Sequence, residues 1–185
     1  EKESKIVGLK PDNEARIIWA DSTQSKTEYV VLYLHGYSAS PMEGDGIHTH
    51  FAERYGCNMY LARLAEHGIK EEEAMLKLTP KGLIESAKEA IAIAQTLGEK
   101  VVILSASTGS TLANYIDAEN PGLIHGHLMY SPNCKMADQT AQVLIYPWGL
   151  QIARKIMGSK YRVGRFNEQD SIHWTFKQRL EGVGA

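Results

Sequence analysis

The sequence has few cysteines and no motif that would group them. Only Cys57 and Cys134 occur among its 185 residues, and there is no CxxC. Two cysteines are too few for a disulfide scaffold. Because unpaired cysteine is among the most buried residue types, we expect two buried or half-buried free thiols rather than a bridge.

A strong excess of one charge and a long apolar run are also missing. The formal net charge is −2 and the basic residues are scattered, which gives no reason to expect a nucleic acid as partner. No apolar run approaches the roughly 20 residues of a membrane-spanning helix. The length suits one domain, or one domain with an inserted lobe. The first residue is Glu1 rather than Met, which leaves the compartment open between the cytoplasm and export after loss of a leader.

What the sequence does contain is an alternation of short apolar runs and helical patterns. Residues 101–104 read VVIL without polar alternation, which is typical of a strand covered on both faces. The next clearest element is a helix that Thr79 caps, Pro80 opens and Gly98 ends. The full set predicts strands at 15–20, 29–34, 58–62, 101–104 and 123–130 and helices at 47–55, 80–97 and 110–118. This order predicts an α/β fold with a mostly parallel sheet and helices on both faces.

The character of the chain changes after Pro132. Residues 138–157 form a mixed aromatic and aliphatic helical stretch that Pro147 and Gly149 interrupt, and a polar, irregular segment follows. We therefore divide the chain into a core, residues 1–132, and a helical, cap-like lobe, residues 133–185. Apolar side chains of the lobe, such as those of Trp148, Leu150 and Met157, form either its own core, which we favour, or the underside of a ligand pocket.

The strand at 101–104 runs into the small residues SASTG, positions 105–109. A nucleophile on a sharp strand-to-helix turn needs small neighbours two positions to either side, and the usual pattern is G-x-S-x-G. Here Ser105 replaces the first glycine, and it is small enough to fit the same turn. The pattern indicates that Ser107 projects from the turn, while the amide of Thr108 can meet a developing oxyanion at a helix start.

Two further motifs follow earlier strands: His35-Gly36 after the strand at 29–34, and R-L-x-x-H-G at 63–68 after the strand at 58–62. In this order and spacing, the three motifs resemble the α/β-hydrolase superfamily, and more narrowly its single-domain esterases, monoacylglycerol-lipase-like enzymes and thioesterases. The resemblance covers residues 15 to about 132. It implies an α/β-hydrolase core and a cap over the acyl pocket.

The resemblance also assigns roles. Ser107 would be the nucleophile, and the amides of Tyr37 and Thr108 would form the oxyanion hole. His35, Gly36 and Gly109 would shape the loops around them. The implied reaction is hydrolysis of a small-molecule carboxylic ester or thioester through an acyl-enzyme on Ser107, without a cofactor or a metal.

The family places its acid and its histidine after the nucleophile, on later strands. His125 and His127 lie within a predicted strand, and we interpret them as packing or hydrogen-bonding residues. The later acids and histidine, which match no family position, are Asp117, Asp138, Asp170 and His173. We therefore expect this chain to be an N-terminal portion whose missing part carries both residues. The alternative is a catalytically silent relative that binds without hydrolysing.

Two other classes are disfavoured. His48-Thr49-His50 resembles the start of a metal-dependent hydrolase site, but no Asp-His follows it and no HExxH occurs. A nucleotide-binding domain is disfavoured because the sequence has neither GxGxxG nor GxxxxGK followed by Ser or Thr. The oligomeric state is left open.

Overall fold

The computed structural model describes residues 3–70, 74–134, 146–157, 161–163 and 177–179. Its strands are β1 (Arg16–Ile18), β2 (Thr27–Leu34), β3 (Asn58–Ala62), β4 (Gly98–Ala106), β5 (Gly126–Tyr130), β6 (Tyr161–Val163) and β7 (Lys177–Arg179). Its α-helices are α1 (Ile47–Tyr55), α2 (Pro80–Leu97), α3 (Thr108–Glu119) and α4 (Gly149–Met157). Three short 3-10 turns are η1 (Glu3–Lys5), η2 (Pro41–Gly44) and η3 (Ala74–Lys77).

The main sheet has five strands in the order β1-β3-β2-β4-β5. β2 pairs with β3 on one side and with β4 on the other, and both pairings are parallel, as is the pairing of β4 with β5. Among the strands described for this sheet, β1 alone runs antiparallel to its neighbour, β3. Because the four parallel strands share a direction, the residues that follow β2, β3 and β4 meet at one edge of the sheet.

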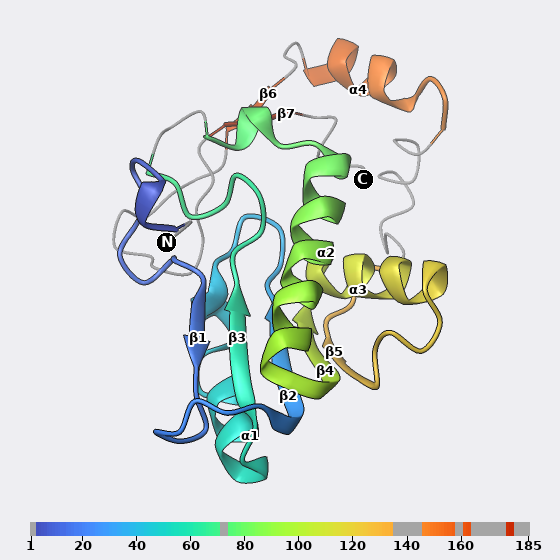
Figure 1. Cartoon of the computed structure of the whole chain (residues 1–185). Coiled ribbons are helices and arrows are strands. Elements are labelled where there is room, and N and C mark those ends of the chain that lie inside the picture. Colours follow the sequence, from blue (N-terminus) through green and yellow to red (C-terminus); the bar gives the residue numbers. More distant parts are fainter. Residues whose placement is uncertain (1–2, 71–73, 135–145, 158–160, 164–176, 180–185) are drawn as a thin grey trace.

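Helices cover both faces of this sheet, as predicted. On one face, α2 and α3 pack against the β2 residues Val30, Leu32 and Leu34. On the other face, α1 packs against Val31 and Tyr33 of the same strand. Adjacent residues of a strand point to opposite faces, so a fully apolar β2 fits a strand with helices on both sides. In Figure 1, α2 crosses one face and α1 lies behind the other.

Several predicted elements are confirmed. Residues 101–104 lie within β4, which is paired on both sides. α2 begins after Thr79, whose hydroxyl oxygen accepts a hydrogen bond from the Gly82 amide at 3.0 Å. α1 occupies residues 47–55, as expected, and ends at Gly56, whose φ of 60° is in the left-handed region.

Other expectations need correction. β5 begins at Gly126 rather than at residue 123, and Leu123 packs against the core from a loop. Cys57 is buried and free as expected, but Cys134 is exposed rather than buried.

In the predicted helical stretch at 138–157, residues 138–145 lie outside the described residues and α4 occupies 149–157. Trp148 is 72% exposed, so it does not belong to a lobe core. The division into core and cap remains a prediction. None of the helices in the described ranges is long and apolar enough to cross a bilayer.

Candidate active site

Ser107 lies between β4 and α3 in an unusual backbone conformation. Its φ is 45° and its ψ is −113°, a region that side-chain-bearing residues rarely adopt. The surrounding bonds hold the turn in place: the Ser107 amide donates to the Tyr130 carbonyl at 3.2 Å, and its own carbonyl accepts from the Ser110 amide at 3.0 Å. Ser107 is half-buried and its side chain makes no capping hydrogen bond. The sharp strand-to-helix turn predicted from the sequence is therefore present.

The small residues on either side of Ser107 are there for packing reasons. A Cβ on Gly109 would lie 2.2 Å from the Leu34 carbonyl oxygen, so only glycine lets α3 approach β2 this closely. Ser105, at the other position, is fully buried, and its hydroxyl lies 2.9 Å from that of Ser110 and 2.8 Å from Nε2 of His127. Serine fits in place of the usual glycine because buried partners satisfy its hydroxyl. His127 has the hydrogen-bonding role predicted for it.

The loop after β2 lies directly beside this turn. A Cβ on Gly36 would be 3.3 Å from Cβ of Ser107, so Gly36 and Ser107 are adjacent although 71 positions separate them in the sequence. Among the residues that the structure describes, the amides of Tyr37 and Thr108 have no hydrogen-bond partner. The structure thus brings the predicted site residues together at one edge of the sheet.

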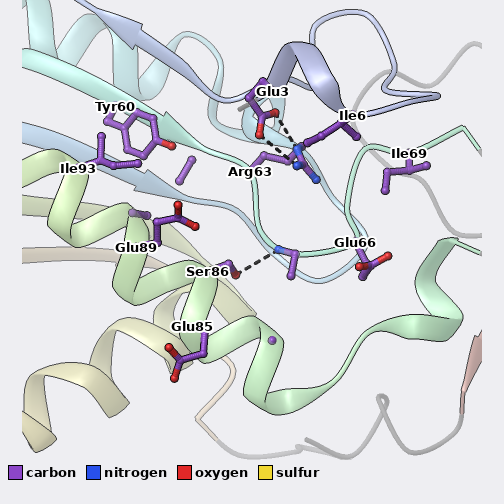
Figure 2. Close-up of a pocket in the computed structure, with 14 residues that line it drawn as sticks. Glu3, Ile6, Tyr60, Arg63, Glu66, Ile69, Glu85, Ser86, Glu89 and Ile93 are labelled. Atoms are coloured by element: carbon purple, nitrogen blue, oxygen red, sulfur yellow. Dashed lines mark hydrogen bonds and ion pairs between the residues drawn. The ribbon is translucent and has the colours of Figure 1, made fainter. Parts of the chain in front are cut away.

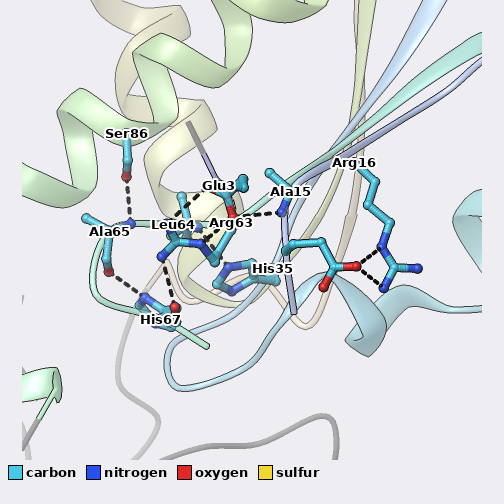
Figure 3. Close-up of polar contacts among 10 residues, drawn as sticks. Glu3, Ala15, Arg16, His35, Arg63, Leu64, Ala65, His67 and Ser86 are labelled. Carbon is cyan, nitrogen blue, oxygen red and sulfur yellow. Dashed lines mark hydrogen bonds and ion pairs between the residues drawn. The ribbon is translucent and has the colours of Figure 1, made fainter. Parts of the chain in front are cut away.

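Two buried histidines fasten this loop to the one that follows β3 (Figure 3). The Leu64 amide donates to Nε2 of His35 at 3.0 Å, and the Ser38 amide donates to Nε2 of His67 at 3.0 Å. The Nδ1 atoms lie 2.8 Å from the carbonyl oxygens of Gly36 and Ala65, respectively. Since each Nε2 accepts, each Nδ1 carries the proton and donates. The prediction gave a loop-shaping role to His35 but none to His67.

The hydrogen bonds that His35 and His67 accept at Nε2 require neutral imidazole rings. Burial lowers the pKa of His67 to about 4, because the hydrogen bond to Ala65 offsets only part of the desolvation. Burial also lowers the pKa of His35 far below its usual value, and the neighbouring His67 and Arg63 lower it further. Both rings therefore remain uncharged at neutral pH and keep Nε2 as an acceptor.

Arg63 supports the same loop from the outside. Its guanidinium forms two bonds to the Glu3 carboxylate, from Nε at 2.8 Å and Nη2 at 3.1 Å, and Nη1 donates to the His67 carbonyl at 3.0 Å. Glu3 also accepts a bond from the Ala15 amide at 3.0 Å. A two-point pair of this kind is geometrically specific. The arginine of the R-L-x-x-H-G motif is therefore structural.

The structure places near Ser107 a carboxylate that the sequence did not indicate. Glu43, on η2, accepts a hydrogen bond from the Gly36 amide at 2.7 Å and one from the Tyr33 hydroxyl at 3.3 Å, both at Oε2. Burial raises the pKa of Tyr33, and the negative charge of Glu43 raises it further, so this phenol remains a donor. No motif pointed to Glu43, because its role depends on the folding back of η2.

The histidines of the disfavoured metal motif point to backbone carbonyls. Nε2 of His48 lies 3.1 Å from the Pro41 oxygen, and Nδ1 of His50 lies 2.7 Å from the Gly46 oxygen. Across the described ranges, no three His, Cys, Asp or Glu side chains gather as metal ligands would. Asp138, Asp170 and His173 lie outside the described residues.

A cavity of about 630 Å³ lies beside α2 (Figure 2). Its lining includes Tyr60, Arg63, Glu66, Ser86 and Glu89, and Ser86 Oγ accepts a bond from the Ala65 amide. None of the predicted site residues lines it. We therefore do not assign the candidate reaction to this cavity.

Comparison with known proteins identifies the architecture. No protein-family model and no curated protein matches the sequence. Among solved structures, one from work on the metagenome-derived lipolytic enzymes LipS and LipT has a TM-score of 0.72 and 16% identity, covering 95% of this chain and 67% of that chain. The monoacylglycerol lipase of Paleococcus ferrophilus has a TM-score of 0.57 and 13% identity, covering 90% and 65%. An extracellular α/β-hydrolase from a Paenibacillus species has a TM-score of 0.51 and 16% identity, covering 74% and 55%.

The chain has the α/β-hydrolase fold. It spans between 55% and 67% of the length of these three structures. The predicted α/β-hydrolase architecture is thereby confirmed. At these identities the likeness extends to the fold, and the chemistry must be inferred from the residues of the site.

Proposed function

We propose that the protein is a serine hydrolase that cleaves a carboxylic ester or thioester through an acyl-enzyme on Ser107. The observation that carries this proposal is the backbone of Ser107, held at a φ of 45° near two amides that have no hydrogen-bond partner in the described ranges. Strained conformations persist only where the surrounding structure enforces them, and they are concentrated at functional sites. Lipolytic structures among the fold's neighbours support the same reaction class.

In the proposed reaction, Ser107 Oγ attacks the carbonyl carbon of the ester, and the carbonyl oxygen acquires negative charge. The amides of Tyr37 and Thr108 donate to that oxygen, and the N-terminus of α3 adds its favourable dipole. The C–O bond of the ester (C–S in a thioester) breaks, the alcohol or thiol leaves with a proton, and water then hydrolyses the acyl-enzyme.

The proposal gives the role of general base to none of the described histidines near the sheet edge. His35 and His67 have both ring nitrogens engaged by the backbone, and Nε2 of His127 is engaged by Ser105. A base must be within hydrogen-bonding reach of the proton that it removes. The reaction of the whole protein therefore needs a base from elsewhere.

The test is labelling of the full-length protein with a fluorophosphonate, which reacts with activated serines. We expect labelling that is lost in Ser107→Ala and kept in Ser22→Ala, the same change at an exposed serine outside the site. Turnover of p-nitrophenyl esters of increasing chain length would then define the acyl group. Labelling that survives Ser107→Ala would refute the assignment. A folded protein that is neither labelled nor active would instead support the silent, ligand-binding alternative.

A further inference from the structure

Glu43 is held rigidly at the edge of the candidate active site. Its amide donates to the Ser40 carbonyl at 3.0 Å within the η2 turn, and its Oε2 receives the two bonds from Gly36 and Tyr33. Gly44 packs closely against the Tyr33 ring, because a Cβ on Gly44 would lie 2.6 Å from Tyr33 Cζ. The carboxylate therefore has little freedom to move away from the loop that it binds.

The same carboxylate faces the space next to Ser107. A methyl group on Gly36 would touch both, at 3.1 Å from Oε1 of Glu43 and 3.3 Å from Cβ of Ser107. Oε1 has no hydrogen-bond partner in the described part of the chain, and no Lys or Arg there forms an ion pair with it. A fixed negative charge thus lies within reach of a ligand bound at Ser107.

We infer that Glu43 determines substrate charge: the site accepts esters whose groups next to the scissile bond are neutral or cationic and discriminates against anionic ones. This inference rests on the proposed function. A ligand carboxylate near Ser107 would be repelled by Glu43, while an ammonium or hydroxyl group could bind Oε1. For a unit charge on the ligand that lies about 6 Å from the Glu43 carboxylate and is partly screened by solvent, the interaction changes kcat/KM by about tenfold.

The experiment compares three p-nitrophenyl esters of similar size, with a neutral, a carboxylate-bearing and a trimethylammonium-bearing acyl chain. For the full-length wild type, we expect kcat/KM to be at least about tenfold lower for the anionic ester than for the neutral one. Glu43→Gln keeps an oxygen that can accept from Gly36 and Tyr33 but removes the charge. This substitution should raise the ratio of kcat/KM for the anionic ester to that for the neutral ester about tenfold. It should lower the corresponding ratio of the cationic ester to the neutral ester.

Glu53→Gln is the matched control, because Glu53 is exposed on α1 and the net charge changes equally. Its ratios should equal those of the wild type. If Glu43→Gln does not fold, the wild-type ratios at rising ionic strength give the second measurement, since screening should bring them together. The inference alone would be overturned by an enzyme that turns over the neutral ester but whose kcat/KM ratios between the esters change neither in Glu43→Gln nor with added salt. Absence of turnover of all three esters would overturn the proposed function as well.

Discussion

Gly109→Ala is the substitution whose cost the structure defines most directly. The added Cβ would lie 2.2 Å from the Leu34 carbonyl oxygen, 2.7 Å from the Leu34 carbonyl carbon and 2.8 Å from the His35 carbonyl oxygen. All three are backbone atoms at the end of β2, so no side chain can rotate away to make room. α3 or β2 must move, and with it either Ser107 or the loop that carries Tyr37.

Overpacking of a well-packed site costs about 1–3 kcal/mol, and a clash with backbone belongs at the upper end. Alanine regains at most about 1 kcal/mol through its better helix propensity. We expect the free energy of unfolding to fall by about 2–3 kcal/mol and the melting temperature by about 4–12 °C. Circular dichroism during thermal and urea unfolding measures both.

Gly82→Ala is the control, because Gly82 also lies in the first turn of a helix against this sheet. Its added Cβ would meet only side-chain atoms, Thr79 Oγ1 at 3.2 Å and Ala65 Cβ at 3.8 Å. Its stability should stay within about 1 kcal/mol of the wild type. Equal stability of the two variants would refute the idea that the close contact of α3 with β2 requires glycine at position 109.

Three further predictions concern stability. Ser107→Gly should be about 1 kcal/mol more stable than Ser107→Ala in urea, because glycine adopts the positive φ without strain; a less stable glycine variant would argue against that strain. The pKa of His67 is about 4 in the folded protein and higher in the unfolded chain, so the unfolded state binds more protons below pH 6.5. Stability should therefore fall by about 3 kcal/mol between pH 6.5 and pH 4 on account of His67, and His67→Gln should flatten that slope; an equally steep slope in His67→Gln would contradict this. Asn58→Asp should cost about 3 kcal/mol or more, because the Asn58 amide donates to two backbone carbonyls, at 2.7 and 2.8 Å, that a carboxylate would repel; an unchanged urea midpoint at pH 7 would contradict this.

The core of this fold could be predicted because its signals are local. The continuous apolar run at 101–104 indicated a strand buried on both faces, and β4 is such a strand, with Val101 and Ile103 in the core on one face and Leu104 in the core on the other. Capping at Thr79 and the left-handed Gly56 are likewise encoded by single residues. The start of β5 was misplaced because Leu123 is apolar for packing against the core from a loop. A hydrophobic pattern records burial, and it cannot distinguish a strand from a loop that packs equally well.

The site was only partly predictable, for a different reason. Ser107, Tyr37 and Gly109 belong to short motifs around two strand ends, and their proximity follows from the parallel direction of those strands. Glu43 and His67 act through bonds that exist only after distant loops fold back on one another. The antiparallel direction of β1 is also a tertiary result, since a strand of three residues carries no directional pattern.

The pairing of Glu3 with Arg63 has a practical consequence for anyone who prepares this protein. Glu3 binds the Arg63 guanidinium, Arg63 donates to the His67 carbonyl, and the His67 ring accepts from the Ser38 amide. A displacement of residue 3 can therefore be transmitted along these bonds to Ser38. A substitution of Glu3, or proteolytic cleavage next to it, would therefore disturb the loop that carries Tyr37 from a distance.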